Sequence, residues 1–270
     1  MNFQPARLWR DKYGFRKIVS FFSDQFAYQI NRKNTTKNLL KNIDPFNIRL
    51  NDPNLITITT SIRNNFSFNK TNKIFGMDYI IQKNKTRILL AQGFDTRSLL
   101  QNGIRIRWNI HPNVTMINQS DVGNKSFDSE FFSSRDYNIN FMTSHLKLQF
   151  QPGISFRLNL QYTLADEQNT LDDEHASKHD TGIEARYNIL NKGSLTGKIN
   201  YINIDYNQDP NSPVAYEMLQ GLLPGHNGVW SVLFQRSITG GIELNLEYSG
   251  RVSAKEKIVH VGGIQIRWNF

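Results

Sequence analysis

The chain has no cysteine among its 270 residues. This absence excludes disulfide bonds, thiol catalysis and thiolate metal ligands, and it leaves the cellular compartment open. No apolar run approaches the roughly 20 residues that a membrane-spanning helix needs. The first residues, MNFQPARLWRDKYGFRKIVSFF, carry charges throughout and contain no apolar core followed by a small-residue cleavage site, so they do not predict a signal peptide. An outer-membrane location would therefore require the sequence to be part of a longer precursor.

Apolar residues make up only 39% of the chain, yet aromatic residues reach 12%. That aromatic content argues against a disordered protein. The net charge of +9 is compatible with nucleic acid, an anionic membrane surface or an anionic ligand as partner. The basic residues recur at alternate positions of strand-like segments and do not form one cluster. Nucleic-acid binding is therefore not predicted.

What the sequence does contain is alternation. The last eight residues read GIQIRWNF, and residues 103–110 read GIRIRWNI. Apolar and polar side chains alternate without interruption in both segments, which is the pattern of a β-strand with two unlike faces. Residues 156–162 and 242–248, FRLNLQY and IELNLEY, repeat the pattern. Repeated strands of one type indicate a sheet or barrel built from one kind of hairpin.

The alternation divides the chain into two regions. Residues 1–53 are irregular, with one candidate strand around Phe26, Tyr28 and Ile30. Residues 54–270 predict about twelve antiparallel strands joined by hairpins. Short turns (HPN, QPG, NKG and ITGG) alternate with longer loops expected at 119–134, 166–180, 207–228 and 249–256. The predicted fold is all-β, an antiparallel up-and-down transmembrane β-barrel, either complete or part of a larger barrel.

A soluble or surface-exposed β-sandwich used in binding or adhesion is the alternative. A sandwich produces the same alternation, because its apolar face lies in the core and its polar face in water. Two features favour the barrel. Several segments keep their alternation for ten or more residues, and transmembrane strands need roughly nine to eleven. The alternation of short and long connections is also typical of outer-membrane barrels.

The ending resembles the C-terminal signal of Gram-negative outer-membrane β-barrels, a final amphipathic strand with alternating aromatic residues and a terminal Phe. Ile264, Ile266, Trp268 and Phe270 carry the resemblance, while Gln265 stands where the common pattern has glycine. The resemblance implies that the barrel assembly machinery recognises this strand. The Asn-, Lys- and Ile-rich texture, with segments such as SPVAYEMLQGLLPG, resembles the C-terminal regions of large outer-membrane proteins of Bacteroidota.

These observations predict a protein of the cell outer membrane with a structural, transport or surface-display role. The apolar strand faces would contact lipid, and the Arg, Asn and Gln faces would line a lumen. Arginines in such a lumen favour anions if it conducts. The segment 208–227 could contact a partner, although an ordered loop with proline breaks is the simpler interpretation. The candidate lumen-facing residues are Arg105, Arg107, Arg157 and Arg267.

Catalysis is not predicted. The segment DDEHASKHD, residues 172–180, has two histidines four apart but lacks the Glu that follows the first His of a zinc-binding helix. Its position between two strands favours a solvated hairpin loop. The six histidines are scattered, and no serine has the sequence context of a nucleophile elbow. The sequence therefore predicts no enzyme activity, no metal site and no cofactor.

Overall fold

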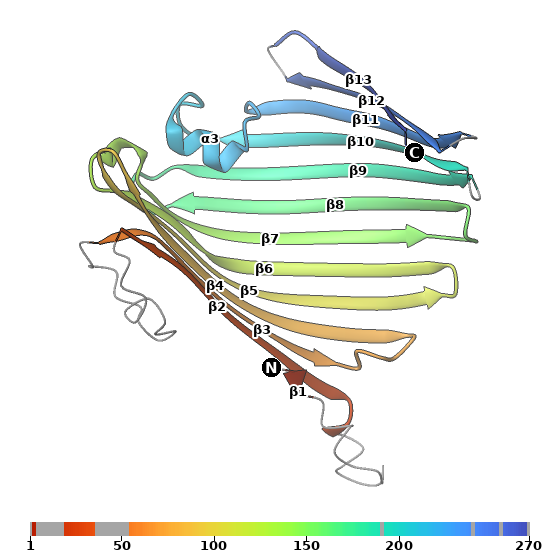
Figure 1. Cartoon of the computed structure of the whole chain (residues 1–270), viewed down its shortest axis with the longest axis horizontal. Helices are drawn as coiled ribbons and strands as arrows, with labels where there is room; N and C mark the ends of the chain where they lie inside the picture. The colour runs from red at the N-terminus through yellow and green to blue at the C-terminus, as the bar shows by residue number, and fades with distance from the viewer. Residues whose placement is uncertain are drawn as a thin grey trace. The chain divides into compact units, whose positions relative to one another are not determined.

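The computed structural model describes residues 2–3, 19–35, 54–189, 192–238, 241–253 and 256–268. Thirteen strands form one sheet in chain order, so each strand lies beside its neighbours in the sequence (Figure 1). The predicted all-β, antiparallel, up-and-down arrangement is confirmed. In the described residues the order is open, beginning at β1 and ending at β13.

Apart from the two-residue strand β1, every strand is 10–19 residues long. Ordinary strands centre on about five or six residues, so these strands exceed the length that a typical soluble sheet uses. The candidate strand around Tyr28 is present as β2. The strands are β1 Asn2–Phe3, β2 Phe22–Asn34, β3 Leu55–Phe68, β4 Phe75–Leu90, β5 Gly93–His111, β6 Val114–Ser129, β7 Tyr137–Phe150, β8 Phe156–Asn169, β9 His175–Ile189, β10 Gly193–Tyr206, β11 Gly225–Ile238, β12 Ile242–Ser253 and β13 Val259–Trp268.

Three of the expected loops are wrong. Most of 119–134 belongs to β6, which continues to Ser129, and most of 166–180 belongs to β8 and β9. Most of 249–256 belongs to β12, which continues to Ser253. In β6, β8 and β9 polar side chains occupy both faces of the strands, which removes the alternation while the backbone ladder continues. On β6, for example, Asn124 donates its side-chain amide to Asn138 and Asn140 of β7, at 2.8 and 2.9 Å.

Contacts divide the chain into two compact units. The first unit comprises Met1–Ile106, Ser120–Met142 and Glu167–Glu174. Its buried apolar residues include Leu55, Ile58 and Ile139. Polar contacts also hold this unit together, among them the ion pair of Lys125 Nζ with Glu167 Oε2 at 2.9 Å.

The second unit comprises Arg107–Gln119, Thr143–Asp166 and His175–Phe270. It contains the helix α3, Pro213–Leu219, in the connection between β10 and β11 (Figure 1). The Ser212 hydroxyl accepts the Ala215 N–H at 2.9 Å and caps the helix, and Pro213 occupies its first turn. Gln220 ends the helix in the left-handed conformation, with φ of 56°. No helix among the described residues is long and apolar enough to cross a membrane.

Candidate functional site

Polar side chains form a continuous row across five strands of the second unit. Residues directly opposite one another in an antiparallel sheet point to the same side. The row offers amide and hydroxyl groups and no apolar side chain. Its members, each opposite the next from β9 to β13, are Asn188, Ser194, Gln235, Asn245 and Gln265.

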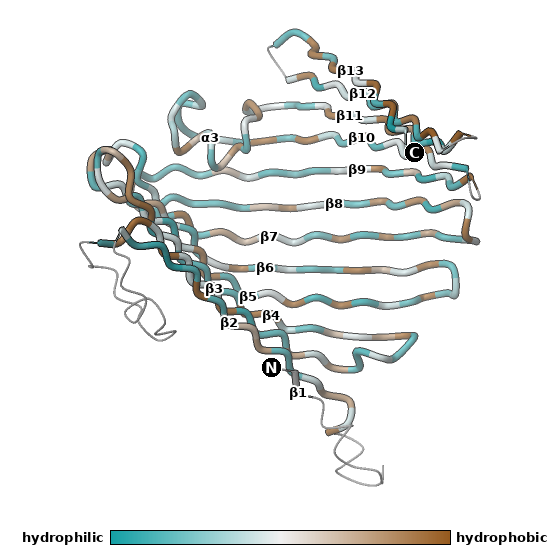
Figure 2. The backbone as a smooth tube through the Cα atoms, viewed as in Figure 1, coloured by the Kyte–Doolittle hydropathy of each residue, from teal (hydrophilic) through white to brown (hydrophobic). Residues whose placement is uncertain are grey.

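The neighbouring row has the opposite character. The next residue along each strand points its side chain to the other face of the sheet. In this second row every side chain is apolar or aromatic. We call these two sides the polar face and the apolar face. Figure 2 shows the resulting alternation of hydrophilic and hydrophobic positions along the strands. The members of this second row are Tyr187, Leu195, Phe234, Leu246 and Ile264.

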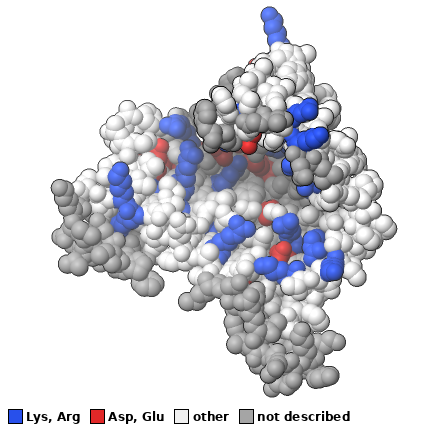
Figure 3. Space-filling view, turned by 45° about the vertical axis from the view of Figure 1, so that its right-hand side comes forward, with Lys and Arg blue, Asp and Glu red and all other residues white. Residues whose placement is uncertain are grey.

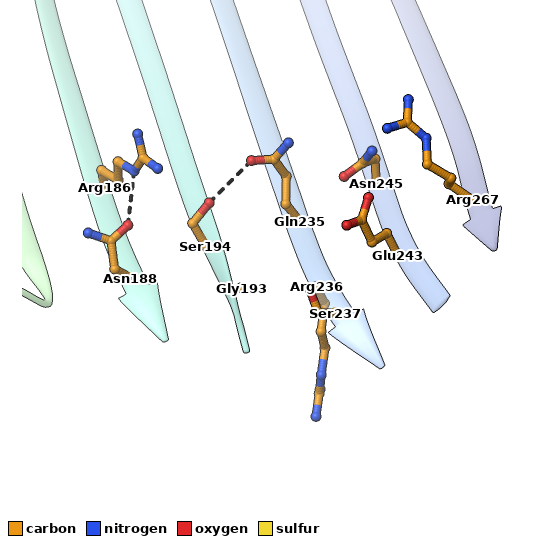
Figure 4. A pocket seen from close by; sticks show the side chains of 10 residues that line it. All are labelled: Arg186, Asn188, Gly193, Ser194, Gln235, Arg236, Ser237, Glu243, Asn245 and Arg267. Atoms are coloured by element: carbon orange, nitrogen blue, oxygen red, sulfur yellow. Dashed lines mark hydrogen bonds between the residues drawn. The ribbon is translucent and has the colours of Figure 1, made fainter. Parts of the chain in front are cut away.

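A pocket of about 440 Å³ opens on the polar face. The Ser194 hydroxyl donates to Gln235 Oε1 at 3.4 Å, and Arg186 Nε donates to Asn188 Oδ1 at 3.0 Å. Figure 4 shows these side chains standing on neighbouring strands of the sheet. The pocket residues are Arg186, Asn188, Gly193, Ser194, Gln235, Arg236, Ser237, Glu243, Asn245 and Arg267.

The charge around this pocket is mainly positive. Arg186 and Arg267 come from β9 and β13, at opposite sides of the row, and Arg236 extends away from the other side chains (Figure 4). Glu243 lies opposite Arg267 in the strand register and is the one acidic residue in the lining. Guanidinium groups present several N–H donors in a planar fork that fits carboxylate and phosphate groups. The pocket therefore suits a small anionic or polar molecule.

Of the four arginines predicted to line a lumen, Arg267 is the one that lines this pocket. Arg157 lies on β8, on the same face as Asn159, and its Nε atom is buried without a hydrogen-bond partner in the described part of the chain. Asn159 donates its side-chain amide to Glu184 at 2.9 Å, which places Arg157 on the polar face as well.

Arg105 and Arg107 lie on one side of β5 and alternate with the exposed Ile104 and Trp108. Arg105 belongs to the first unit and Arg107 to the second. Their part in lining a lumen stays a prediction.

The C-terminal strand keeps the predicted alternation as far as it is described. Ile264, Ile266 and Trp268 share the apolar face, opposite Leu246, Leu244 and Ile242 of β12. Phe270 lies outside the described residues. Recognition of this strand by an assembly machinery stays a prediction.

Sequence reasoning missed Arg186, Ser194 and Gln235. Arg186 lies between Ala185 and Tyr187, so its face could be predicted, whereas Gln235 is followed by the charged Arg236. The residues that stand beside each of them depend on the strand register, which follows from turn geometry as well as from the pattern. The NKG and ITGG turns mark the right hairpins, but their sequences do not fix the pairing of Ser194 with Gln235.

The histidine-rich segment 172–180 is not a solvated loop throughout, because His175 begins β9. His175 Nε2 lies 3.0 Å from Asp166 Oδ2, and His179 Nδ1 lies 2.7 Å from the Tyr162 hydroxyl. The two rings thus have separate partners. No group of three or more potential metal ligands occurs in the described residues.

The predicted partner segment, 208–227, contains α3. Its apolar side chains Val214, Ala215, Met218 and Leu219 are buried, whereas Tyr216 is exposed. These burials fit the interpretation as an ordered loop, and a partner for this segment stays a prediction.

No protein-family model and no curated protein matches the chain. Among solved structures, the chain is similar to the beta domain of the Bordetella autotransporter Brka. The alignment has 7% identity and a TM-score of 0.41, and it covers 92% of this chain and 98% of that one.

Proposed function

We propose that this chain is an outer-membrane β-barrel protein, or the barrel portion of a larger one. Its apolar face contacts lipid, and its polar face lines a hydrated interior. One observation carries the proposal: across β9 to β13 a fully polar row and a fully apolar row lie on opposite faces of one sheet. In the described residues, exposed large apolar side chains outnumber buried ones severalfold.

This exposure would be unfavourable in water. Each square ångström of apolar surface left in water costs about 25 cal/mol relative to burial, and soluble monomers rarely expose contiguous apolar patches above a few hundred square ångströms. The apolar face runs across many neighbouring strands, so its summed area exceeds that limit. A lipid environment removes the cost, and closing the sheet leaves no backbone edge unpaired in hydrocarbon.

The β-sandwich alternative is not supported. A sandwich needs two sheets packed face to face, whereas all thirteen described strands belong to one sheet. An apolar core between two sheets would also bury the row that contains Leu195, which is exposed.

The polar face of the second unit favours passage or retention of anions. Its strand residues include eight cationic side chains and four carboxylates. Charged rings of Arg and Lys select anions in pores. Figure 3 likewise shows Lys and Arg outnumbering Asp and Glu on the face in view. The cations are Arg107, Lys147, Arg157, Lys178, Arg186, Lys198, Arg251 and Arg267, and the carboxylates are Asp180, Glu184, Glu243 and Glu247.

Refolding separates the membrane barrel from a soluble protein. The chain is refolded into detergent micelles and compared, boiled and unboiled, on a denaturing gel, with circular dichroism on both samples. We expect a β-rich spectrum and a band whose migration changes on boiling. A β-rich monomer in plain buffer, without that change, would contradict the proposal.

Planar-bilayer recording then tests the anion preference. Under a KCl gradient the reversal potential should lie closer to the equilibrium potential of chloride than to that of potassium. A membrane-inserted protein that never conducts would support a structural or display role in place of transport, and the proposal of anion passage would fail.

A further inference from the structure

Three tyrosine–histidine pairs recur on the apolar face of the second unit. In each pair the tyrosine hydroxyl lies within hydrogen-bond distance of a histidine Nδ1 on the next strand. The pairs are Tyr162 with His179 at 2.7 Å, Tyr201 with His226 at 2.7 Å and Tyr248 with His260 at 2.8 Å. They join β8 to β9, β10 to β11 and β12 to β13, so every second strand contributes the tyrosine.

The registers place glycine opposite two of these tyrosines. Tyr201 lies opposite Gly228, and Tyr248 lies opposite Gly262. Each tyrosine ring reaches diagonally to the histidine two residues away from that glycine, and the stacked rings have centroids 5.8 and 6.0 Å apart.

A tryptophan covers the glycine opposite it. Trp230 lies opposite Gly250, and a Cβ atom on that glycine would come within 2.4 Å of the indole ring. The Trp230 ring is 6.0 Å from the His260 ring. A side chain at position 250 would therefore collide with the indole.

On β10 the pair lies at the end of the apolar band. On β10 the apolar face carries Leu195, Ile199 and Tyr201, and the next residues on that face are Asn203 and Asp205. On β13 the apolar residues Ile264 and Ile266 lie on one side of His260 along the strand. We call Tyr162, His179, Tyr201, His226, Trp230, Tyr248 and His260 the Tyr–His belt.

The belt crosses the strands obliquely. His179 and His226 both lie opposite Asn203 of β10. His260 lies opposite Gly250, Gly250 lies opposite Trp230, and Trp230 lies opposite Ile199 of β10. The shift is four residues, and all of it falls between β11 and β13.

The direction of each pair's hydrogen bond fixes which imidazole nitrogen carries a proton. Where the tyrosine O–H donates to Nδ1, the neutral ring carries its own proton on Nε2. A protonated ring also keeps a proton on Nε2. The tyrosine hydroxyl is satisfied within the pair, so it does not need water at the edge of the hydrocarbon.

We propose that the Tyr–His belt seats the protein in the headgroup layer of a phospholipid bilayer, where the histidine Nε2–H groups donate to headgroup phosphates. This inference rests on the proposed function, because it requires the apolar face to contact lipid. Aromatic girdles at barrel interfaces place ring systems at this depth. The histidines supply a donor that a tyrosine hydroxyl engaged in its pair no longer offers.

Depth-dependent fluorescence quenching tests the position of the belt. Trp9, Trp108 and Trp268 are changed to Phe, so that Trp230 is the single reporter in phosphatidylcholine vesicles brominated at shallow, middle or deep acyl positions. We expect the shallow bromines to quench Trp230 several-fold more than the deep ones. A matched reporter, Leu246→Trp with Trp230→Phe, should show the reverse order.

The outcomes separate the two proposals. Stronger quenching of Trp230 by deep bromines would overturn the belt while leaving a membrane protein. Absence of quenching at both reporters would overturn the membrane function itself.

Solid-state NMR tests the phosphate contact. The histidines are labelled with ¹⁵N, and dephasing of Nε2 by lipid ³¹P is measured in the same vesicles, with single His→Phe variants for assignment. Dephasing is expected for His179, His226 and His260 and not for His145, which contacts Thr163 on the polar face. Dephasing absent from the three belt histidines, in a protein whose Trp230 is quenched by shallow bromines, would overturn the phosphate contact.

Discussion

Asn159 of β8 donates its side-chain amide to Glu184 of β9, with 2.9 Å between Nδ2 and Oε1, and Asn159 is only 2% exposed. A carboxylate on the polar face is thus bound by a side chain of the neighbouring strand. Replacing Asn159 with Leu removes the donor and leaves the carboxylate without this partner. We expect a loss of about 1–3 kcal/mol in the free energy of unfolding, measured by urea titration in micelles.

Gln161→Leu on the same face of β8 is the control for that change, since Gln161 lies farther along the strand than the Glu184 contact. An equal loss in both variants would mean that general polarity, and not the Asn159–Glu184 bond, stabilises the face.

Leu195 and Thr196 test the two faces of β10. Leu195 is 42% exposed and lies on the apolar face, four residues from the row of Trp230, whereas Thr196 lies on the polar face. Leu195→Arg puts a charge into lipid away from the belt, and a charge at the bilayer midplane costs about 2–4 kcal/mol. We expect a sharp drop in the fraction of protein that inserts into vesicles, measured by the band that resists denaturation without boiling.

Thr196→Arg should insert as well as the unchanged protein, because its side chain remains in the hydrated interior. If Leu195→Arg inserts equally well and Thr196→Arg does not, the assignment of the two faces is inverted.

The arginines of the pocket should determine ion selectivity. In the double variant Arg186→Gln and Arg267→Gln, two positive charges are lost where Glu243 remains. We expect the reversal potential under a KCl gradient to shift toward the equilibrium potential of potassium. Arg236→Gln is the matched control, because this side chain extends away from the pocket (Figure 4). A shift of the same size in the control would assign selectivity to the net charge of the protein.

The last strand should matter for assembly more than for stability. Phe270→Ala removes the terminal aromatic residue of the predicted assembly signal. We expect a several-fold lower amount in the outer membrane of an expressing cell, measured by membrane fractionation, and unchanged refolding into micelles.

Arg267→Gln, on the opposite face of the same strand, should leave the amount in the outer membrane unchanged. Equal losses of Phe270→Ala in cells and in micelles would mean that this residue stabilises the barrel and is not a recognition signal.

Alternation made most of the sheet predictable. The β10 strand reads apolar and polar in turn from Ser194 to Tyr201, and its faces follow from period two alone. The alternation ends where strands carry polar groups on both sides, so the sequence predicted loops where β6, β8 and β9 continue. The amide contacts of Asn124 show why these segments remain paired.

The pocket and the belt were harder to predict because both depend on register. Tyr201 and His226 are separated by a connection that contains α3, and nothing local indicates that their side chains meet. Arg267 lies on the polar face, as its apolar neighbours indicate, and its place in a lumen stays a prediction. Its position near the Ser194–Gln235 pair required the pairing of five strands. The resemblance to Bacteroidota outer-membrane proteins stays a prediction.

Strand order that equals chain order has a consequence for how such a protein can change in evolution. Each strand is hydrogen-bonded only to its neighbours in the sequence, so a whole hairpin can be duplicated or lost without disturbing the remaining pairs. The two copies of the repeated segment lie in β5 and β13, strands eight positions apart and therefore equal in direction. A gain of hairpins by duplication would place such copies in this way, and the sheet would then widen by two strands at a time.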